Sequence, residues 1–145
     1  MEGLSFFVEA TARGSGAERE GSLAVDGHEI RYSVPASMGG KGVGASPETL
    51  LISAVTACYT LTLLAYLSKR RLPYREIAVR TQGVVTGSPR HVYSRIIVNP
   101  TVLGADPDRG EAYRDSAADA RSHCFIGQTV AAGGVQYELG SVEFV

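Results

Sequence analysis

Residues 49–68 read TLLISAVTACYTLTLLAYLS, a run of twenty residues with no charged side chain. A serine, a proline and a glutamate at positions 46–48 precede this run and supply a helix cap, a first-turn proline and a first-turn acid. Arg70 and Arg71 suit the carboxyl end of a helix, and Pro73 ends it. The stretch therefore predicts one long apolar helix that runs to Arg70 or Arg71.

Both sides of this helix are apolar on a helical wheel. Leu51 and Leu61 share a side with Cys58, and Leu63 and Leu67 lie opposite. We expect both sides to be buried, although one small sheet covers only one of them. A second copy of the chain is therefore predicted to supply the missing layer in a homodimer.

The same run is long enough to cross a membrane. It contains several Ser and Thr residues and two tyrosines, and no other segment or flank supports insertion. A helix that is apolar all round is typical of the interior of a fold. We expect a buried helix and no membrane partner.

Strands and one more polar helix are expected on either side of the long helix. The order of elements, strands, helix, strands, helix, strands, predicts an α+β fold with antiparallel sheets packed around a long central buried helix, in a single domain of residues 1–145. The expected strands are 4–12, 22–25, 28–34, 77–86, 91–102, 135–139 and 142–145, with a turn at Asp26-Gly27, a loop at Gly87-Ser88-Pro89, a helix from Asp106-Pro107 to His123 and a short helix after Cys124.

Composition narrows the possible function classes. The chain has 145 residues, is 44% hydrophobic and carries a net charge of −1, with 14 basic and 15 acidic residues in no block of one sign. This pattern does not favour nucleic-acid binding. The N-terminal MEGLSFFVEATA lacks the features of a signal peptide, so we expect a cytoplasmic protein. Its two cysteines, Cys58 and Cys124, are then predicted to be redox-active, catalytic or buried thiols rather than a structural disulfide.

Two other motifs resemble a phosphate-binding loop and a metal site, but each departs from the residues or spacing that such a site needs. The loop 38–45, MGGKGVGA, precedes a helix start, yet Gly42 follows Lys41 where a phosphate-binding loop needs Ser or Thr. The dinucleotide-binding spacing of glycines is absent as well. His123 beside Cys124 indicates metal binding only weakly, because with Cys58 they give three candidate ligands at an unfamiliar spacing. We expect no cofactor and no metal.

The sequence resembles the OsmC/Ohr family of osmotically inducible and organic hydroperoxide resistance proteins. The resemblance rests on Arg19 in a loop between early strands, on Ser46-Pro47-Glu48 opening a long apolar helix, on Ala57-Cys58-Tyr59 ten residues later, and on His123-Cys124 after a second helix. It covers nearly the whole chain in element order, and the spacing from Pro-Glu to Ala-Cys is its most specific part. A proline commonly follows the second cysteine in this family, whereas this chain has Phe125, so the subgroup stays open.

The resemblance implies an interwoven α+β homodimer that acts as a thiol peroxidase, with two active sites at the dimer interface. Cys58 would be the peroxidatic cysteine and Cys124 the resolving cysteine. Arg19 and Glu48 would form the supporting ion pair, with Arg13 as the competing arginine. The implied partners are a hydroperoxide substrate and an external dithiol reductant such as a dihydrolipoyl group.

The chemistry of a peroxidase gives the same residues a physical role. A thiolate attacks one peroxide oxygen and leaves a sulfenic acid, which a second thiol converts into a disulfide. Because a free thiol has a pKa of about 8.5, the nucleophile needs nearby positive charge. Cys58 lies too deep in its helix for the N-terminal dipole, so an arginine is expected to supply that charge. Ten residues of helix separate Glu48 from Cys58 by roughly 15 Å, so Glu48 is expected to hold the arginine rather than contact the sulfur.

Apolar neighbours of the cysteines, Tyr59 and Phe125, predict a preference for bulky organic hydroperoxides over hydrogen peroxide. Two other interpretations stay open. The chain could be a non-catalytic dimeric ligand-binding or scaffolding protein on the same fold, with two inert buried thiols, or an anion or nucleotide binder that uses the glycine loop. The reactivity of Cys58 separates the three.

Overall fold

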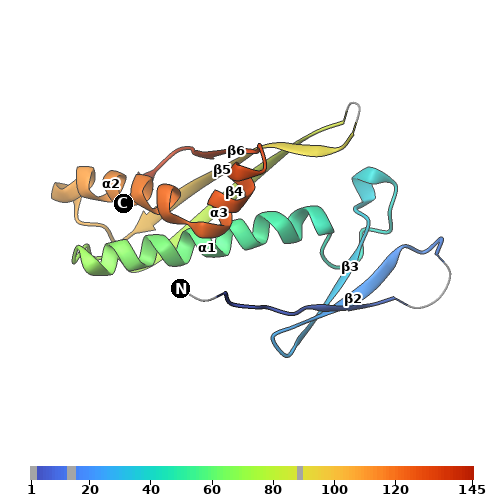
Figure 1. The fold of residues 1–145 in the computed structure, drawn as a ribbon. Coiled ribbons are helices and arrows are strands. Elements are labelled where there is room, and N and C mark those ends of the chain that lie inside the picture. Colours follow the sequence, from blue (N-terminus) through green and yellow to red (C-terminus); the bar gives the residue numbers. More distant parts are fainter. Residues whose placement is uncertain (1–2, 13–15, 88–89) are drawn as a thin grey trace. The chain divides into compact units, whose positions relative to one another are not determined.

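The structure, a computed structural model, describes residues 3–12, 16–87 and 90–145 (Figure 1). The chain divides into two compact units, Met1–Leu51 and Ile52–Val145. The long helix α1 (Pro47–Lys69) begins in the first unit and continues in the second. The prediction of a single domain stays a prediction.

The first unit contains a three-stranded antiparallel sheet in the order β1-β2-β3. The strands are β1 (Glu9–Thr11), β2 (Glu20–Val25) and β3 (His28–Ser33), followed by the short 3-10 helix η1 (Ala36–Met38). Asp26 and Gly27 join β2 to β3, and both have positive φ, 47° and 79°, as a tight type I′ hairpin turn requires. The predicted hairpin is confirmed.

The first strand is shorter than the sequence predicts. Strand pairing begins at Glu9, and the apolar residues before it are exposed, with Phe6 at 82% and Phe7 at 86%. The sequence predicted a strand here, but no described strand pairs with 4–8. The prediction of a strand over 4–12 is therefore correct only for its last third.

Helix α1 begins where the sequence predicts, because its cap is complete. The backbone N–H of Thr49 donates to Ser46 Oγ (3.1 Å), and the N–H of Ser46 donates to Thr49 Oγ1 (3.0 Å). This reciprocal pair has the arrangement of a capping box, with Thr49 in the place of the usual acid or amide. Pro47 and Glu48 form the first turn, as expected.

The second unit is built on a four-stranded mixed sheet. Strands β4 and β5 pair antiparallel, with a bulge at Val84/Val85, whereas β6 and β7 both pair parallel to β5. The sequence predicted antiparallel sheets, and this sheet departs from that because two helices lie between β5 and β6 and return the chain to the start of β5. Its elements are β4 (Glu76–Thr86), β5 (Val92–Leu103), η2 (Pro107–Arg109), α2 (Gly110–His123), α3 (Phe125–Ala132), β6 (Gln136–Leu139) and β7 (Glu143–Phe144).

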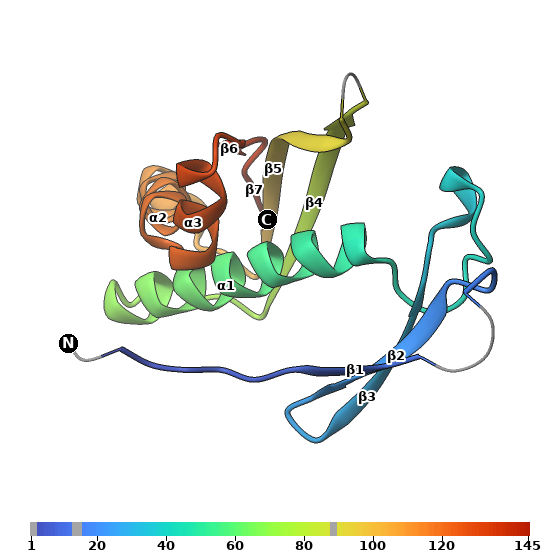
Figure 2. The ribbon, with the colours of Figure 1, turned by 45° about the vertical axis from the view of Figure 1, so that its right-hand side comes forward.

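A single apolar core fills the second unit. Helix α2 lies beside α1 in the ribbon views of Figure 1 and Figure 2. The Tyr59 hydroxyl of α1 donates to the Ala117 carbonyl of α2 at 3.0 Å. Each of the large buried side chains contributes about 1.5–3 kcal/mol of burial free energy. The core includes the α1 stripe Val55, Tyr59, Leu63 and Leu67, the β5 residues Ile96, Val98 and Val102, and Tyr113, Ala120, Cys124 and Tyr137.

Only one side of α1 is buried within the chain. Its fully buried residues recur every four positions, whereas Leu61, on the other side, is 68% exposed; Leu51, one turn before this stripe, is 40% exposed. By length and composition α1 also satisfies the requirements for a membrane span. Its buried stripe lies in the core beside the sheet and α2, as in the core helix of a soluble domain.

Candidate thiol site

The fold brings the two cysteines of the chain together. Cys58 lies in the middle of α1 and Cys124 lies between α2 and α3, and both are free thiols. The Cys58 and Cys124 side chains lie in the same core and are close enough to influence each other's ionisation. Cys58 is half-buried, whereas Cys124 is fully buried and its Sγ lies 3.9 Å from the Val55 carbonyl oxygen of α1. A pair of neighbouring thiols with unequal exposure can cycle between dithiol and disulfide.

Cys124 occupies a break between two helices. It ends α2 and begins α3, with an extended backbone (φ −72°, ψ 107°) that turns the chain. Burial raises the pKa of the Cys124 thiol, while the backbone N–H of Gly127 and the Tyr137 hydroxyl oppose that rise by interacting with the sulfur. The sulfur therefore faces the first turn of α3, where backbone N–H groups favour negative charge.

Two buried tyrosines lie next to the thiols, and of these Tyr137 was not predicted. Tyr59 is fully buried, and Tyr137 is 2% exposed. Burial raises the pKa of both phenols, so both stay protonated at neutral pH. Tyr137 gave no sequence signal, because β6 carries it to Cys124 only through the parallel pairing with β5.

Tyr59 does not line an entrance from solvent, which corrects the expectation that it flanks an apolar opening. Its side chain points into the core and is held there by the bond to Ala117. The adjacent Cys58 lies one residue back on the helix, toward the exposed side. Phe125 is 66% exposed, so of the two aromatic neighbours it alone meets solvent.

The predicted ion-pair residues lie in the other unit. Arg19 and Glu48 belong to Met1–Leu51, whereas both cysteines belong to Ile52–Val145. Arg19 is exposed, with a positive φ of 50°, and its carbonyl accepts a bond from Val34 N at 3.4 Å. Glu48 is half-buried in the first turn of α1. Arg13 lies outside the described residues. The predicted roles of Arg19, Glu48 and Arg13 stay predictions.

His123 points away from the sulfur beside it. Its Nδ1 lies 2.8 Å from the Asp119 carbonyl oxygen, and its ring contacts Tyr66 at a centroid distance of 5.8 Å. Among the described residues, no group of three or more His, Cys, Asp or Glu side chains is arranged to hold a metal ion.

The glycines of loop 38–45 pack the loop against its neighbours. A Cβ at Gly40 would lie 2.0 Å from the Val34 carbonyl oxygen, and one at Gly44 would lie 2.3 Å from that of Arg31. The Ser33 hydroxyl donates to the Val43 carbonyl (2.9 Å) and accepts from the Val43 N–H (2.8 Å). Close backbone approach therefore accounts for these glycines without a phosphate ligand.

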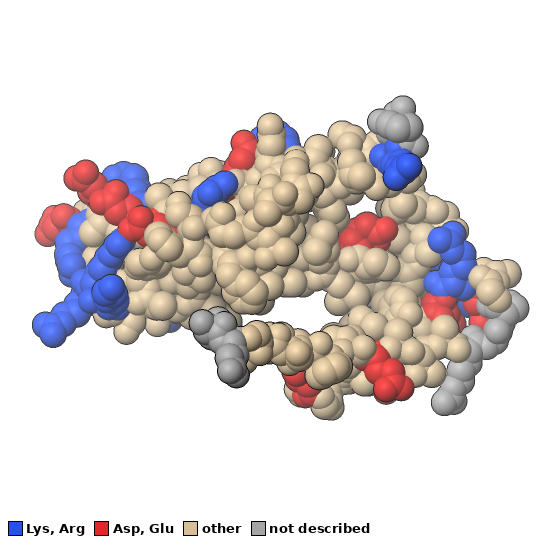
Figure 3. All heavy atoms as spheres, in the orientation of Figure 1, with Lys and Arg blue, Asp and Glu red and all other residues tan. Residues whose placement is uncertain are grey.

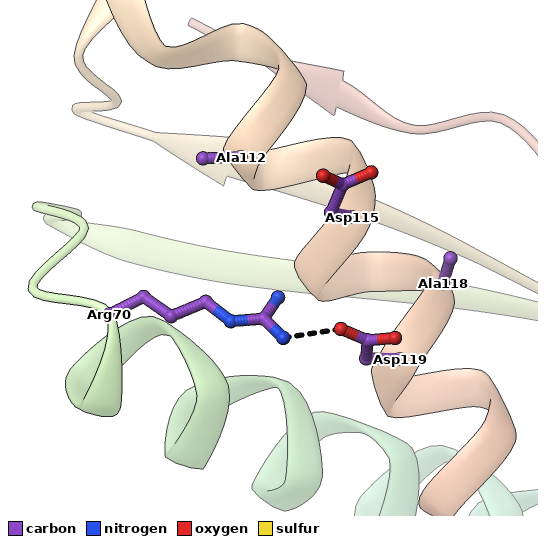
Figure 4. A pocket seen from close by; sticks show the side chains of 5 residues that line it. All are labelled: Arg70, Ala112, Asp115, Ala118 and Asp119. Carbon is purple, nitrogen blue, oxygen red and sulfur yellow. Dashed lines mark hydrogen bonds and ion pairs between the residues drawn. The ribbon is translucent and has the colours of Figure 1, made fainter.

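A surface hollow of about 410 Å³ lies where α1 ends beside α2 (Figure 4). Neither cysteine is among the residues that line it. Arg70 crosses it, forms an ion pair with Asp119, donates to Ser116 Oγ at 2.9 Å and lies over the Tyr66 ring at 4.8 Å. These contacts tie the two helices together.

On the face drawn in Figure 3, basic and acidic side chains occur in mixed groups, in keeping with the balanced charge of the sequence.

Comparison with known proteins identifies the family. Residues 39–140 match the sequence profile of OsmC, described as OsmC-like protein. The chain belongs to the OsmC-like protein family. The matched range of this OsmC-like chain includes Glu48, Cys58 and Cys124 and begins after Arg19. The uncharacterized protein YmaD of Bacillus subtilis (strain 168) is 28% identical over 111 residues, which is 74% of this chain and 73% of YmaD.

Solved structures of the family share the fold. An OsmC-like protein of unknown function from Vibrio cholerae O1 biovar eltor str. N16961 has a TM-score of 0.80 at 16% identity, over 98% of this chain and 100% of that one. An organic hydroperoxide resistance protein OsmC from Legionella pneumophila has a TM-score of 0.73 at 19% identity, over 97% of this chain and 99% of that one. The predicted family and the α+β class are confirmed.

Proposed function

We propose that this chain is a thiol-dependent peroxidase that reduces organic hydroperoxides, with Cys58 as the attacking and Cys124 as the resolving thiol. The observation that carries this proposal is the meeting of the two cysteines, distant in sequence, as neighbouring free thiols in one core. Membership of the OsmC-like family supports it, as does the name of the Legionella pneumophila protein.

The proposed reaction has two steps within the protein. The Cys58 thiolate attacks the terminal oxygen of the hydroperoxide, the O–O bond breaks, and the alkoxide leaves as the alcohol after taking up a proton. Cys58 is then a sulfenic acid. The Cys124 thiolate attacks the Cys58 sulfur, the S–O bond breaks, and hydroxide leaves as water with the proton released by Cys124. The peroxide has gained two electrons, and the two thiols have become one disulfide.

The unequal exposure of the thiols supports this order of roles. Cys58 is half-buried on α1, so a peroxide can reach it from solvent, whereas Cys124 has no exposed surface. Cys124 is also the thiol whose pKa burial raises. A thiol that reacts second, with a sulfenic acid already beside it, needs neither access to the substrate nor a low pKa at rest.

Arg19 and Glu48 complete the proposed site. Cys58 lies about three turns inside α1, beyond the reach of the helix dipole, so a guanidinium would stabilise its thiolate. Arg19 is our choice for that group, and the Glu48 carboxylate would orient it through a bidentate pair. Arg19 and Glu48 belong to one unit and the cysteines to the other. The proposal therefore requires that Arg19 reach Cys58 from the same chain or from a second copy.

The protein is proposed to act as a cytoplasmic homodimer that is regenerated by an external dithiol, for example a dihydrolipoyl group. The dithiol reduces the Cys58–Cys124 disulfide and becomes a disulfide itself, which balances the two electrons. The exposed Leu51 and Leu61 on α1 support a second copy as the missing layer, because large apolar side chains on one helix face favour association.

Steady-state turnover with different peroxides tests the proposal. With dihydrolipoamide as reductant, kcat/KM is expected to be at least about tenfold higher for cumene hydroperoxide than for hydrogen peroxide, because an apolar surface that includes Phe125 binds the bulky group. Equal values would contradict the apolar site. No turnover of either peroxide would favour a non-catalytic ligand-binding or scaffolding protein on the same fold.

A further inference from the structure

We infer that Tyr137 is a positioning residue for the second step: its buried hydroxyl donates a hydrogen bond to the Cys124 sulfur when that sulfur is a thiolate. The inference rests on the proposed function, because it assigns a group that helps the resolving cysteine attack. It concerns β6 and the start of α3, which lie outside the predicted set of site residues.

The Tyr137 hydroxyl is a buried polar group that needs a partner. The residue is 2% exposed, and its oxygen makes no hydrogen bond of ordinary geometry with any described residue. A buried hydroxyl without a bond costs free energy, so its position calls for an explanation. The Cys124 thiol is the nearby group that raises the pKa of this hydroxyl most after burial itself, and it is a weak acceptor that becomes a strong one on losing its proton.

The Tyr137 ring is held in place from both sides. Gly127 in α3 lets it approach, because a Cβ there would lie 2.1 Å from Tyr137 Cε2. Arg121 of α2 lies over the ring at 5.0 Å from its centroid and donates through Nε to the Tyr137 carbonyl at 3.0 Å. The hydroxyl is therefore directed at the first turn of α3, where Cys124 is the cap residue.

The surroundings of Cys124 show why a donor matters there. Helix α1 contributes Cys58 and Tyr59, α2 contributes Arg121, which faces Tyr137, and β6 contributes Tyr137. Burial opposes the Cys124 thiolate, and among the described residues the side chains that shift its pKa, Cys58 and Tyr137, carry no positive charge. The α3 backbone N–H groups and the Tyr137 hydroxyl are then the available donors. Because burial raises the pKa of Tyr137, the phenol keeps its proton and acts as a donor without transferring it.

A Tyr137→Phe variant removes the hydroxyl and keeps the ring. Peroxide should oxidise Cys58 at the wild-type rate, while disulfide formation at pH 7 slows by about tenfold or more, because a hydrogen bond to the thiolate is lost. Rapid-quench trapping of the sulfenic acid with dimedone measures both steps. The pH dependence of disulfide formation should move to higher pH, a change that a purely structural role would not produce. Tyr113→Phe is the matched control, since that buried hydroxyl donates to the Pro73 carbonyl and not to either thiol, and it should leave both rates unchanged.

A second measurement does not depend on peroxidase activity. In a Cys58→Ser background, the thiolate absorbance of Cys124 near 240 nm should titrate about one pH unit higher when Tyr137 is also Phe. An unchanged titration midpoint would overturn the inference even if the wild type reacts with no peroxide. Conversely, the wild type could show no peroxide turnover while the midpoint still shifts. That result would contradict the proposed function but support the hydrogen bond from Tyr137 to the Cys124 thiolate.

Discussion

Cys58 and Cys124 lie in different electrostatic surroundings although they are neighbours. Cys124 caps α3 and faces the Gly127 N–H and the Tyr137 hydroxyl. Cys58 lies inside α1, where the backbone N–H groups are used within the helix. Stabilisation of the Cys58 thiolate is therefore expected from a side chain outside α1, and we propose that an arginine supplies it.

The choice between Arg19 and Arg13 is a prediction at the scale of a residue. Arg19→Ala is expected to slow oxidation of Cys58 by cumene hydroperoxide at least about tenfold at pH 7, because less of the thiol is ionised without the cation. Stopped-flow kinetics on the reduced protein measure this step. Arg13→Ala is the matched control and should change the rate less than about twofold. The reverse result would assign the role to Arg13, and no effect of either would contradict an arginine-activated thiol.

Sequence reasoning predicted the cysteine pair but not its surroundings. Cys58 and Cys124 stand out because they are the two cysteines of the chain and match a family pattern. Tyr137 and Gly127 meet only after β6 has paired with β5 and α3 has folded against it, and neither residue has a local signature. Contacts of this kind depend on tertiary packing, which periodicity and spacing do not encode.

At the scale of elements, α3 packs against β6 through one very close contact. Gly127 faces the Tyr137 ring without room for a methyl group. Gly127→Ala is expected to lower the free energy of unfolding by about 1–3 kcal/mol, because the ring or the helix must shift. Urea denaturation of the reduced protein measures the change.

Gly133→Ala is the control for this prediction. Gly133 ends the same helix with a φ of −80°, and a Cβ there would come no closer than 3.4 Å to another atom, the Val130 carbonyl oxygen. Alanine should therefore be nearly neutral at this position. Similar losses for the two variants would mean that α3 is sensitive to any substitution and that the Tyr137 contact is not special.

The elements with complete local signals were predicted well. The cap and apolar run gave α1, and the Asp26-Gly27 turn gave the β2–β3 hairpin. The errors lie where a long-range partner decides the outcome. Pairing of the first strand begins only at Glu9. Strands β6 and β7 join β5 in parallel, which depends on where α2 and α3 return the chain.

At the scale of the whole molecule, the exposed side of α1 makes the homodimer testable. Leu61 is 68% exposed, so Leu61→Glu leaves the core of the chain intact and places a charge on the proposed interface. The wild type is expected to be a dimer by sedimentation equilibrium, and the variant should dissociate at least about tenfold more readily. Val92→Glu, on an exposed apolar residue of β5, is the control. A wild-type monomer, or equal dissociation of both variants, would contradict the proposed interface.

The most direct test of the central claim counts free thiols before and after one equivalent of cumene hydroperoxide, by alkylation under denaturing conditions. Wild type, Cys58→Ser and Cys124→Ser are compared. We expect the wild type to lose both thiols and Cys124→Ser to lose its single thiol to the sulfenic acid. Cys58→Ser should keep its thiol, because Cys124 is buried. Survival of both thiols in the wild type would contradict the peroxidase and favour a binding protein with two inert cysteines.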